Sequence, residues 1–332
     1  MQPCRSGILP KRSIISKQIR PLTHLQRHTV FSESAFNSGH SITQGHHMLP
    51  SNWSFTRKVQ LAAAVIGMLG VCMLSGLLKT TRQPMDFSDP GKFLVRTRDQ
   101  DGKEIVLERV NSFADDFETV ISRKIEGWHQ EMKLSSGSKP GAPANNLQTT
   151  TEQVHTGMFS LKTQTSQDAH DLQKAALLRE LFFFPPHSDF WFSAWYYIPG
   201  QSDIENLFLF DLEATANDGL GRRLMLTGSN GRYLMLEGKQ STGPQYAQTT
   251  SPVPFPRDQW VHLKLHLHLS TGAEGRVELW QDGMLILDKQ GPNIPPDTFY
   301  DRIEVGQTAN STHQALTVYV DDVRVSDKPI DD

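Results

Sequence analysis

Between Trp260 and Leu269 apolar and polar residues alternate strictly, and this stretch constrains the fold more than any other part of the chain. A period of two with one apolar face is typical of a half-buried antiparallel strand. Asp282-Gly283 follows between RVELWQ and MLILD, and such a pair is the strongest short-range signal for a β-hairpin. The apolar face of the first strand holds Val261, Leu263, Leu265 and Leu267.

Short β-like segments separated by Gly, Pro, Asn or Asp clusters fill the chain from residue 104 onwards. This spacing is typical of an all-β sandwich or barrel, and no long segment of helical period interrupts it. The main predicted loop, 134–152, is polar and rich in Pro and Gly. The other expected strands are Glu104–Val110, Phe113–Glu118, Met158–Thr163, Ala175–Phe184, Phe190–Ile198, Leu207–Glu213, Arg222–Thr227, Arg232–Glu237, Arg276–Asp282, Met284–Asp288, Arg302–Val305 and Leu316–Ser326.

Charge is divided unevenly along the chain. Residues 1–82 hold ten of the 33 Lys and Arg but one of the 36 Asp and Glu, so residues 83–332 hold 23 basic and 35 acidic residues, a net charge of −12. Such an acidic region is a poor partner for nucleic acid or anionic lipid. Cys4 and Cys72 both lie outside it. A disulfide, a metal-thiolate site and a cysteine nucleophile are therefore excluded from 83–332.

The run Val59–Leu78 has twenty residues without a charge, which matches the thickness of a bilayer core and predicts a transmembrane signal-anchor helix. A cleavable signal peptide or a lipoprotein signal at Cys72 fits less well, because no good cleavage site follows the run and Val71 is bulky. Large following domains are translocated largely regardless of charge. We therefore expect a single-pass membrane protein whose bulk is extracytoplasmic, in the periplasm or at the cell exterior.

The segments flanking the span differ in composition. Residues 1–58 are basic and rich in Ser and His, so we expect a disordered arm, or an organellar transit peptide. Alternatively, Met48 is the true start. Residues 79–102 contain Pro84, Pro90 and Gly91 and are predicted as a linker, which leaves 103–328 as the folded domain.

Several segments together resemble concanavalin A-like lectins and glucanases, a laminin G-like jelly-roll superfamily. FPRDQWVHLKLHLHL from Phe255, GRVELWQDGMLILD from Gly275 and LTVYVDDVRVS from Leu316 resemble its closing half. GMFSLKT, AALLREL and DFWFSAWYYIP resemble the opening half of the heparin-lyase and alginate-lyase-like polysaccharide lyase branch. The resemblance covers about 105–328. It implies an antiparallel two-sheet jelly-roll sandwich, preceded here by one transmembrane helix and a disordered arm, with a concave face that relatives use to hold glycans.

Retaining glucanases of this superfamily carry Glu-x-Asp-x-Glu on a concave strand, and the similar stretch here is Leu209 to Glu213. Asp211 and Glu213 match the helper and the general acid. Leu209 stands in the place of the nucleophile, and retaining chemistry needs two carboxylates about 5–5.5 Å apart. We therefore expect no hydrolysis, and assign Asp211 and Glu213 either to glycan binding or to the polar face of a strand.

Alginate-lyase relatives carry Arg-x-Glu, whose two side chains share one strand face. Here Arg179 and Glu180 are adjacent, so they are expected to point to opposite faces. A lyase also needs a base and a proton donor, usually His and Tyr in such folds. If the chain is a lyase, the resemblance implies Arg179, His262 and Tyr197 as its catalytic residues.

The segment PHSDFWFSAWYYIPG is the richest in aromatic residues. Trp191, Trp195 and Tyr197 share one strand face, and Phe190, Phe192 and Tyr196 share the other. One set must pack in the core, and hydrophobicity does not decide which. The first set is assigned to carbohydrate binding, because aromatic faces stack on sugar rings; a pure core role stays open.

Jelly-roll carbohydrate modules often share a calcium site between an early strand with Phe-Glu and a late strand with Asp-Asp. Phe117-Glu118 and Asp321-Asp322 are similar in kind and position. Carboxylates suit Ca²⁺. The resemblance thus implies a structural calcium ion at Asp116, Glu118 and Asp321, with solvent-facing acids as the alternative.

Together these patterns favour a membrane-anchored domain that binds polysaccharide without catalysis. The first alternative is a polysaccharide lyase acting on a uronate-containing glycan by β-elimination. The second is a structural or protein-binding envelope domain. Fold alone does not establish which of these functions the chain has.

Overall fold

The computed structural model describes residues 85–98, 102–121, 124–135, 145–167, 172–217, 219–229, 231–239 and 243–331. The chain divides into two units, Met1–Thr80 and Thr81–Asp332, and every described residue lies in the second. Within the described residues no helix combines the length and the apolar character needed to cross a membrane. The basic arm 1–58 and the predicted span Val59–Leu78 lie outside the described residues.

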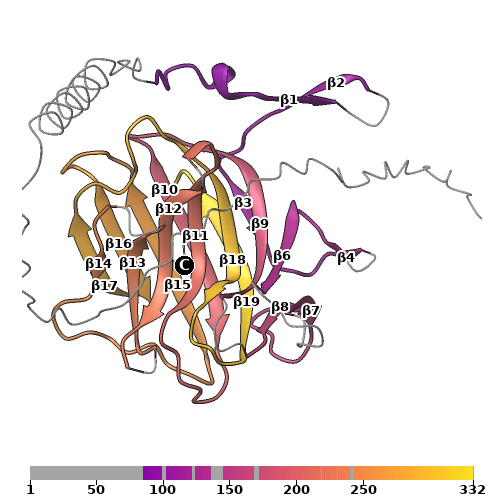
Figure 1. Ribbon diagram of the computed structural model, residues 1–332, viewed down its shortest axis with the longest axis vertical. Coiled ribbons are helices and arrows are strands. Elements are labelled where there is room, and N and C mark those ends of the chain that lie inside the picture. The colour runs from indigo at the N-terminus through magenta and orange to yellow at the C-terminus, as the bar shows by residue number, and fades with distance from the viewer. Residues whose placement is uncertain are drawn as a thin grey trace, which may run out of the picture. The chain divides into compact units, whose positions relative to one another are not determined.

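Two antiparallel sheets form the domain, as the jelly-roll resemblance implies (Figure 1). In the 8-stranded sheet the order is β17 (Met284–Gln290), β16 (Arg276–Gln281), β15 (Trp260–His268), β10 (Asp189–Tyr197), β19 (Leu316–Ser326), β8 (Ser160–Thr165) and β7 (Asn146–Thr150), with β3 (Phe113–Asp115) also paired to β19. In the 7-stranded sheet the order is β14 (Tyr246–Ala247), β13 (Tyr233–Gly238), β12 (Leu220–Thr227), β11 (Leu207–Ala214), β18 (Tyr300–Asn310), β9 (Gln173–Phe184) and β6 (Gln130–Ser135).

Short elements complete the described chain. Two-stranded sheets join β1 (Val95–Arg98) to β2 (Glu104–Leu107) and β4 (Val120–Ile121) to β5 (Lys124–Ile125). The helical turns are η1 (Pro90–Phe93) and η2 (Thr215–Asn217). η1 and β1 lie inside the predicted linker 79–102, where Phe93 packs 5.0 Å from the ring of Phe183 and so fixes this segment on the domain.

The core lies between the inner faces of the two sheets. Phe192 of β10 stacks on Phe210 of β11 with ring centroids 4.0 Å apart, and both side chains are fully buried. The Tyr196 hydroxyl crosses the same interface and donates to the Leu209 carbonyl at 3.0 Å. Burial of this hydroxyl keeps the pKa of Tyr196 well above its usual range. Apolar packing across the sheets therefore fixes which side of β10 and β11 faces outwards.

Most expected strands and the hairpin are confirmed, with differences at their ends. β15 alternates buried and half-exposed residues as predicted, and Asp282 takes the positive φ of 50° that its turn requires. The predicted loop 134–152 was wrong at β7, because Leu147 is buried in the core and β7 pairs with β8. β18 is also longer than Arg302–Val305, since its polar end is hydrogen-bonded inside the fold through Gln307.

Candidate functional site

The outer face of the 8-stranded sheet presents a row of aromatic and imidazole rings. We call it the aromatic face. On β10 the core takes Phe190, Phe192 and Tyr196, so Trp191, Trp195 and Tyr197 face outwards and are half-exposed. The pairing of β10 with β15 and β19 places the rings of the three strands next to one another. The aromatic face consists of Trp191, Trp195, Tyr197, Trp260, His262, His266, Trp280 and Tyr319.

His155 joins this face from the loop between β7 and β8. The backbone N–H groups of His155 and Thr156 donate to the Asp321 carboxylate at 2.9 and 3.3 Å, which holds the loop against β19. The His155 ring then stacks on Trp195 with centroids 3.7 Å apart and an interplanar angle of 18°. Its Nδ1 lies 2.8 Å from Oδ2 of Asp322.

The bond to Asp322 determines which nitrogen of His155 can act as a base. An ionised carboxylate only accepts hydrogen bonds, so Nδ1 of His155 must carry the proton toward Asp322. In the neutral imidazole this assignment leaves the lone pair on Nε2. His155 therefore has the arrangement of an oriented general base.

A chain of ring contacts leads from this histidine to two tyrosines and a lysine. Trp260 contacts both His155 and Tyr197, with ring centroids 5.7 Å away in each case. The Tyr197 ring also meets the Tyr319 ring edge to face at 5.9 Å. Lys162 of β8 lies next to Tyr319, with its Nζ 5.8 Å from the centroid of that ring. His155, Tyr197 and Lys162, together with Trp195 and Trp260, form what we call the histidine corner of the aromatic face.

Glu152 connects Lys162 and Tyr319. Its Oε2 accepts from Lys162 Nζ at 2.6 Å and from the Tyr319 hydroxyl at 2.8 Å. The bond from Lys162, followed by that from Tyr319, lowers the pKa of Glu152. Burial, followed by the bond to Glu152 and its charge, raises the pKa of Tyr319 to about 12. Tyr319 is thus held neutral, and it orients Glu152 rather than acting as a base.

His262, which the sequence also nominates, lies on the other side of Trp195. The rings of His262 and Trp195 are 4.8 Å apart, and Nε2 of His262 lies 2.7 Å from the Ser193 hydroxyl. Trp195 is thus flanked by two imidazoles, and the Asp322 carboxylate orients that of His155.

The outer face of the 7-stranded sheet is different in chemistry, and we call it the charged face. Asp211 and Glu213 point outwards from β11, yet both are fully buried. Lys239 pairs with both acids, Arg223 lies 3.2 Å from Asp211, and Arg302 pairs with Glu213. The charged face consists of Lys174, Asp211, Glu213, Arg223, Lys239, Arg302 and Glu304.

The acids of the charged face are therefore covered by their own cations. Burial acts to raise the pKa of Asp211, but the charges of Arg223 and Lys239 outweigh it and lower that pKa. A glycan meeting this face would reach the partly exposed cations before either carboxylate. None of the described strands of this sheet contains a histidine. The charged face thus fits a structural ion network better than proton-transfer chemistry.

Arg179 lies away from both surfaces. It pairs in register with Ile303, a core residue, whereas Glu180 pairs with Arg302, which confirms that the two adjacent side chains point to opposite faces. The guanidinium lies 4.1 Å from the centroid of Phe113 and donates to the Gly127 carbonyl. Of the three residues nominated for a lyase, the structure brings His262 and Tyr197 onto one face and places Arg179 elsewhere.

Two of the acids nominated for calcium, Glu118 and Asp321, bind the loop that carries His155. Glu118 Oε1 accepts from the N–H groups of Met158 and Phe159 at 2.8 Å, while Asp321 holds the preceding residues. Asp116 lines a cavity of about 340 Å³ together with Asp322. Among the described residues, the group with three possible ligand atoms within 4.8 Å of one another is Asp211, Glu213 and Glu304, and not the nominated set.

Sequence reasoning missed His155, Lys162, Tyr319 and Trp260 as members of the site. His155 carried no signal, since it lies in a loop and reaches Trp195 only through tertiary contacts. Tyr319 and Trp260 do lie in predicted strands, at positions whose side chains face outwards. Placing them next to Tyr197 would also have required the pairing of those strands with β10.

Comparison with known proteins agrees with this fold. The structure of an endo-β-1,4-glucuronan lyase from the fungus Trichoderma reesei matches with a TM-score of 0.50 and 13% identity, covering 65% of this chain and 95% of that one. The cellulose-induced protein Cip1 matches at 0.49 and 17%, covering 66% and 98%, and the alginate lyase Aly36B at 0.43 and 11%, covering 68% and 100%. At these identities the likeness is one of fold. No curated protein matches the chain.

The two antiparallel sheets form a two-sheet sandwich with the fold of the glucuronan lyase. The model of the polysaccharide lyase family matches residues 118–324, which is most of the described domain. The chain belongs to the polysaccharide lyase family.

Proposed function

We propose that this chain cleaves a uronate-containing polysaccharide by β-elimination at the histidine corner. The observation that carries the proposal is His155, which is bonded to Asp322 at Nδ1 and stacked on Trp195, beside Tyr197. Membership of the polysaccharide lyase family supports this class of reaction. The two catalytic motifs compared with relatives, Arg179-Glu180 and Leu209 to Glu213, lie instead on β9 and β11, in the sheet whose outer face carries the buried ion network.

The chemistry assigns one role to each group. Nε2 of His155 takes the C5 proton of the uronate, and the electron pair of that C–H bond forms the C4–C5 double bond. The C4–O glycosidic bond breaks, and the leaving oxygen takes a proton from the Tyr197 hydroxyl. Lys162 supplies positive charge beside the substrate carboxylate, which stabilises the charge that develops there. Trp195 holds the His155 imidazole in place by stacking on it.

Local charge makes this corner more suitable for a uronate than the domain average. The region 83–332 carries a net charge of −12, which would repel an acidic polymer. Glu152 at the corner is already paired with Lys162, and the Asp322 carboxylate is bonded to His155. Each of these two acids thus has a basic partner at the corner, which reduces its repulsion of a uronate.

Non-catalytic binding of polysaccharide is the second candidate. The half-exposed Trp191, Trp195 and Tyr197 on one strand face favour it, since such rows stack on sugar rings. A structural or protein-binding role would need neither these rings nor the oriented histidine.

The test is incubation of the full chain with a panel of neutral and uronate-containing polysaccharides. A lyase leaves an unsaturated uronate that absorbs near-ultraviolet light, whereas a hydrolase leaves reducing ends without it. We expect unsaturated product from a uronate polymer, its loss in His155→Ala, and its persistence in His268→Ala, a matched histidine on the same sheet face. Retardation in a gel containing the polymer, without any product, would support binding alone.

We further propose that the folded domain lies outside the cytoplasm, anchored through Val59–Leu78. The proposal rests on the length and composition of that run. The protein should then fractionate with membranes, and protease added to intact spheroplasts should remove residues 83–332. Protection of the domain in intact spheroplasts would contradict the orientation.

A further inference from the structure

A second ring stack lies on the aromatic face, further along β10 from the histidine corner. Trp191 and His266 are direct partners across β10 and β15, and their rings stack at 4.0 Å with an interplanar angle of 14°. Trp280 of β16 lies nearly parallel to Trp191, at 6.0 Å and 18°. Both indoles are half-exposed. Trp191 and Trp280 form a flat surface that we call the second platform.

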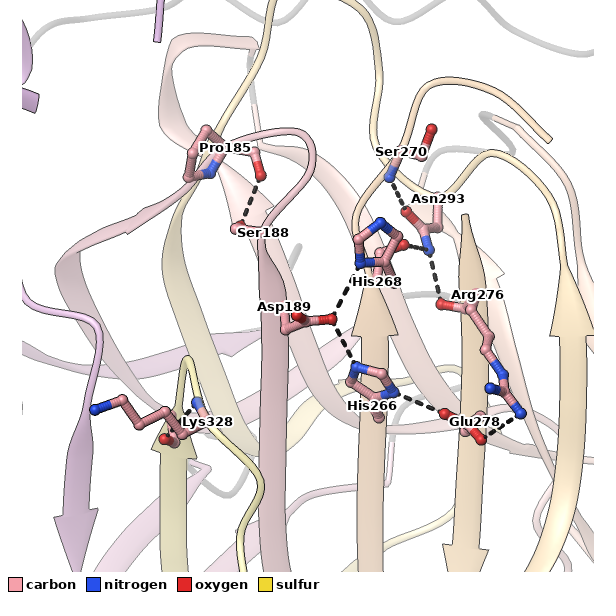
Figure 2. A network of polar contacts seen from close by, with 11 residues as sticks. Pro185, Ser188, Asp189, His266, His268, Ser270, Arg276, Glu278, Asn293 and Lys328 are labelled. Carbon is pink, nitrogen blue, oxygen red and sulfur yellow. Dashed lines mark hydrogen bonds and ion pairs between the residues drawn. The ribbon is translucent and has the colours of Figure 1, made fainter. Parts of the chain in front are cut away.

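His266, which stacks on Trp191, is held at both ring nitrogens by acids (Figure 2). Nε2 lies 2.9 Å from Asp189 Oδ1, and Nδ1 lies 2.7 Å from Glu278 Oε2. A neutral imidazole has a single N–H, whereas an imidazolium has two. Both contacts are hydrogen bonds to ionised carboxylates only if His266 is the imidazolium.

Loss of that proton would disturb the stack above it. One ring nitrogen would then turn a lone pair toward either Asp189 or Glu278, and two acceptors would face each other in a half-buried place. The side chains of His266 and Glu278 are each 12% exposed, so water can replace the lost bond only partly. The imidazolium also attracts the face of the Trp191 indole through a cation–π interaction, which the neutral ring lacks.

Charged groups from every neighbouring strand face His266. Asp189 comes from β10, and His268 of β15 also bonds Asp189, at 3.1 Å. On β16, Arg276 pairs with Glu278 at 2.8 Å, and it reaches Asp288 of β17 as well. Burial acts to raise the pKa of Asp189, but its bonds to both histidines outweigh this and lower the pKa. Asp189 thus stays an acceptor for His266.

We propose that Trp191 and Trp280 bind pyranose rings of the polysaccharide outside the histidine corner, and that this second platform is formed fully only while His266 is the imidazolium. The ligand class is a sugar ring that presents an apolar C–H face, because two parallel indoles offer stacking surface and few hydrogen bonds. Trp280 also lies under Lys264, whose Nζ is 5.5 Å from its centroid, which suits a chain that carries carboxylates.

This inference rests on the proposed function for the identity of its ligand, although it needs no catalysis. Trp195 and Trp191 lie four residues apart on β10 and face the same way, so they are separated by about 13 Å along the strand. One extended polysaccharide chain can contact both. The second platform would then add affinity for long chains and little for a short oligosaccharide that fills the histidine corner alone.

The experiment measures binding separately from cleavage. The full chain carrying His155→Ala is run in native gels that contain a soluble uronate polysaccharide, between about pH 5 and about pH 8, where histidine titrates. Trp191→Ala and Trp280→Ala are added singly to this background. His266→Gln, which keeps a hydrogen-bond donor but no charge, is compared with His268→Gln as the matched control.

We expect retardation by the polymer to weaken as the pH rises, and to weaken about threefold to tenfold in each Trp variant at low pH. His266→Gln should abolish the pH dependence, whereas His268→Gln should keep it. Equal retardation of the parent and both Trp variants would overturn the second platform. An unchanged pH dependence in His266→Gln would show that the protonation of His266 does not control the platform. Pronounced retardation without any unsaturated product from the wild-type chain would reject the lyase reaction and leave the platform standing.

Discussion

His155 and Trp195 stack face to face, with ring centroids 3.7 Å apart, although one lies in a loop after β7 and the other near the end of β10. The stack exists because two carboxylates hold His155 in place. Asp321 accepts a hydrogen bond from the backbone N–H of His155, and Asp322 accepts one from the Nδ1–H of the His155 ring. Two adjacent acids on β19 thus position one imidazole over one indole. The φ of 50° at Asp322 marks the irregularity in β19 that lets both acids reach the loop.

The orienting role of Asp322 predicts a kinetic effect. In Asp322→Asn the ring of His155 can adopt the other tautomer, so the fraction with a basic Nε2 falls. We expect kcat on a uronate polymer to decrease at least about 10-fold, with a smaller change in KM. Asp327→Asn, an exposed acid just beyond β19, is the control. A kcat equal to that of the wild type would show that Asp322 does not orient the base.

Asp321 predicts a dependence of stability on pH. Burial, with the adjacent charge of Asp322, raises the pKa of Asp321 to about 6, compared with about 3.9 in an unfolded chain. The folded state therefore binds more protons between these values, and this contribution to stability is lost as the pH rises through about 6. Relative to Asp321→Asn, which does not titrate, the Tm of the wild type should fall between about pH 4 and about pH 7. Parallel Tm curves for the two proteins would contradict the assignment.

Calcium binding stays a prediction of the sequence that melting can test. Asp321 and Glu118 hold opposite ends of the segment 155–159, and a buried carboxylate beside Asp322 would be stabilised by a nearby cation. Excess Ca²⁺ should raise the Tm of the wild type by ligand linkage, chelator should reverse the change, and Asp321→Asn should show no response. Superimposable melts with calcium and with chelator would show that no ion binds there.

Removing a buried acid from the charged face should lower the stability of the fold more than breaking an exposed ion pair. Glu213 is fully buried between Lys239 and Arg302, so Glu213→Gln removes the acid that pairs with Arg302 and one of the two acids that pair with Lys239. Because both cations can still reach water in part, we expect a loss of about 1–3 kcal/mol in the free energy of unfolding, measured in urea. Glu104→Gln breaks the exposed pair with Arg96 and should cost less than about 1 kcal/mol. Similar losses in both variants would contradict the distinction.

The sequence was sufficient for the sheets where the period of two was unambiguous, as in β15. It did not show which face of β10 packs in the core, because Phe190 and Trp191 are equally apolar. In the structure Phe192 stacks on Phe210, so the face with Phe190, Phe192 and Tyr196 packs in the core. β7 was missed for the opposite reason. Its polar residues look like a loop, and its strand exists through pairing with β8 and the burial of Leu147.

In the candidate site, too, the sequence predicted what depends on local alternation and missed what depends on long-range contacts. Trp191, Trp195 and Tyr197 could be assigned to one surface from alternation alone. Asp211 and Glu213 looked like ligands for sugar because alternation places them outwards, but Lys239 and Arg302 come from other parts of the chain and cover them. His155 depends on contacts with β19, which alternation along the chain does not contain.

The mass of the product tests the central claim most directly. Wild-type chain and His155→Ala are incubated with the same uronate polymer, and the masses of the oligosaccharides are measured by mass spectrometry. Elimination at the histidine corner predicts products lighter by one water than hydrolytic fragments from the wild type, and none from His155→Ala. Unsaturated products formed equally well by His155→Ala, or hydrolytic masses from the wild type, would contradict the account.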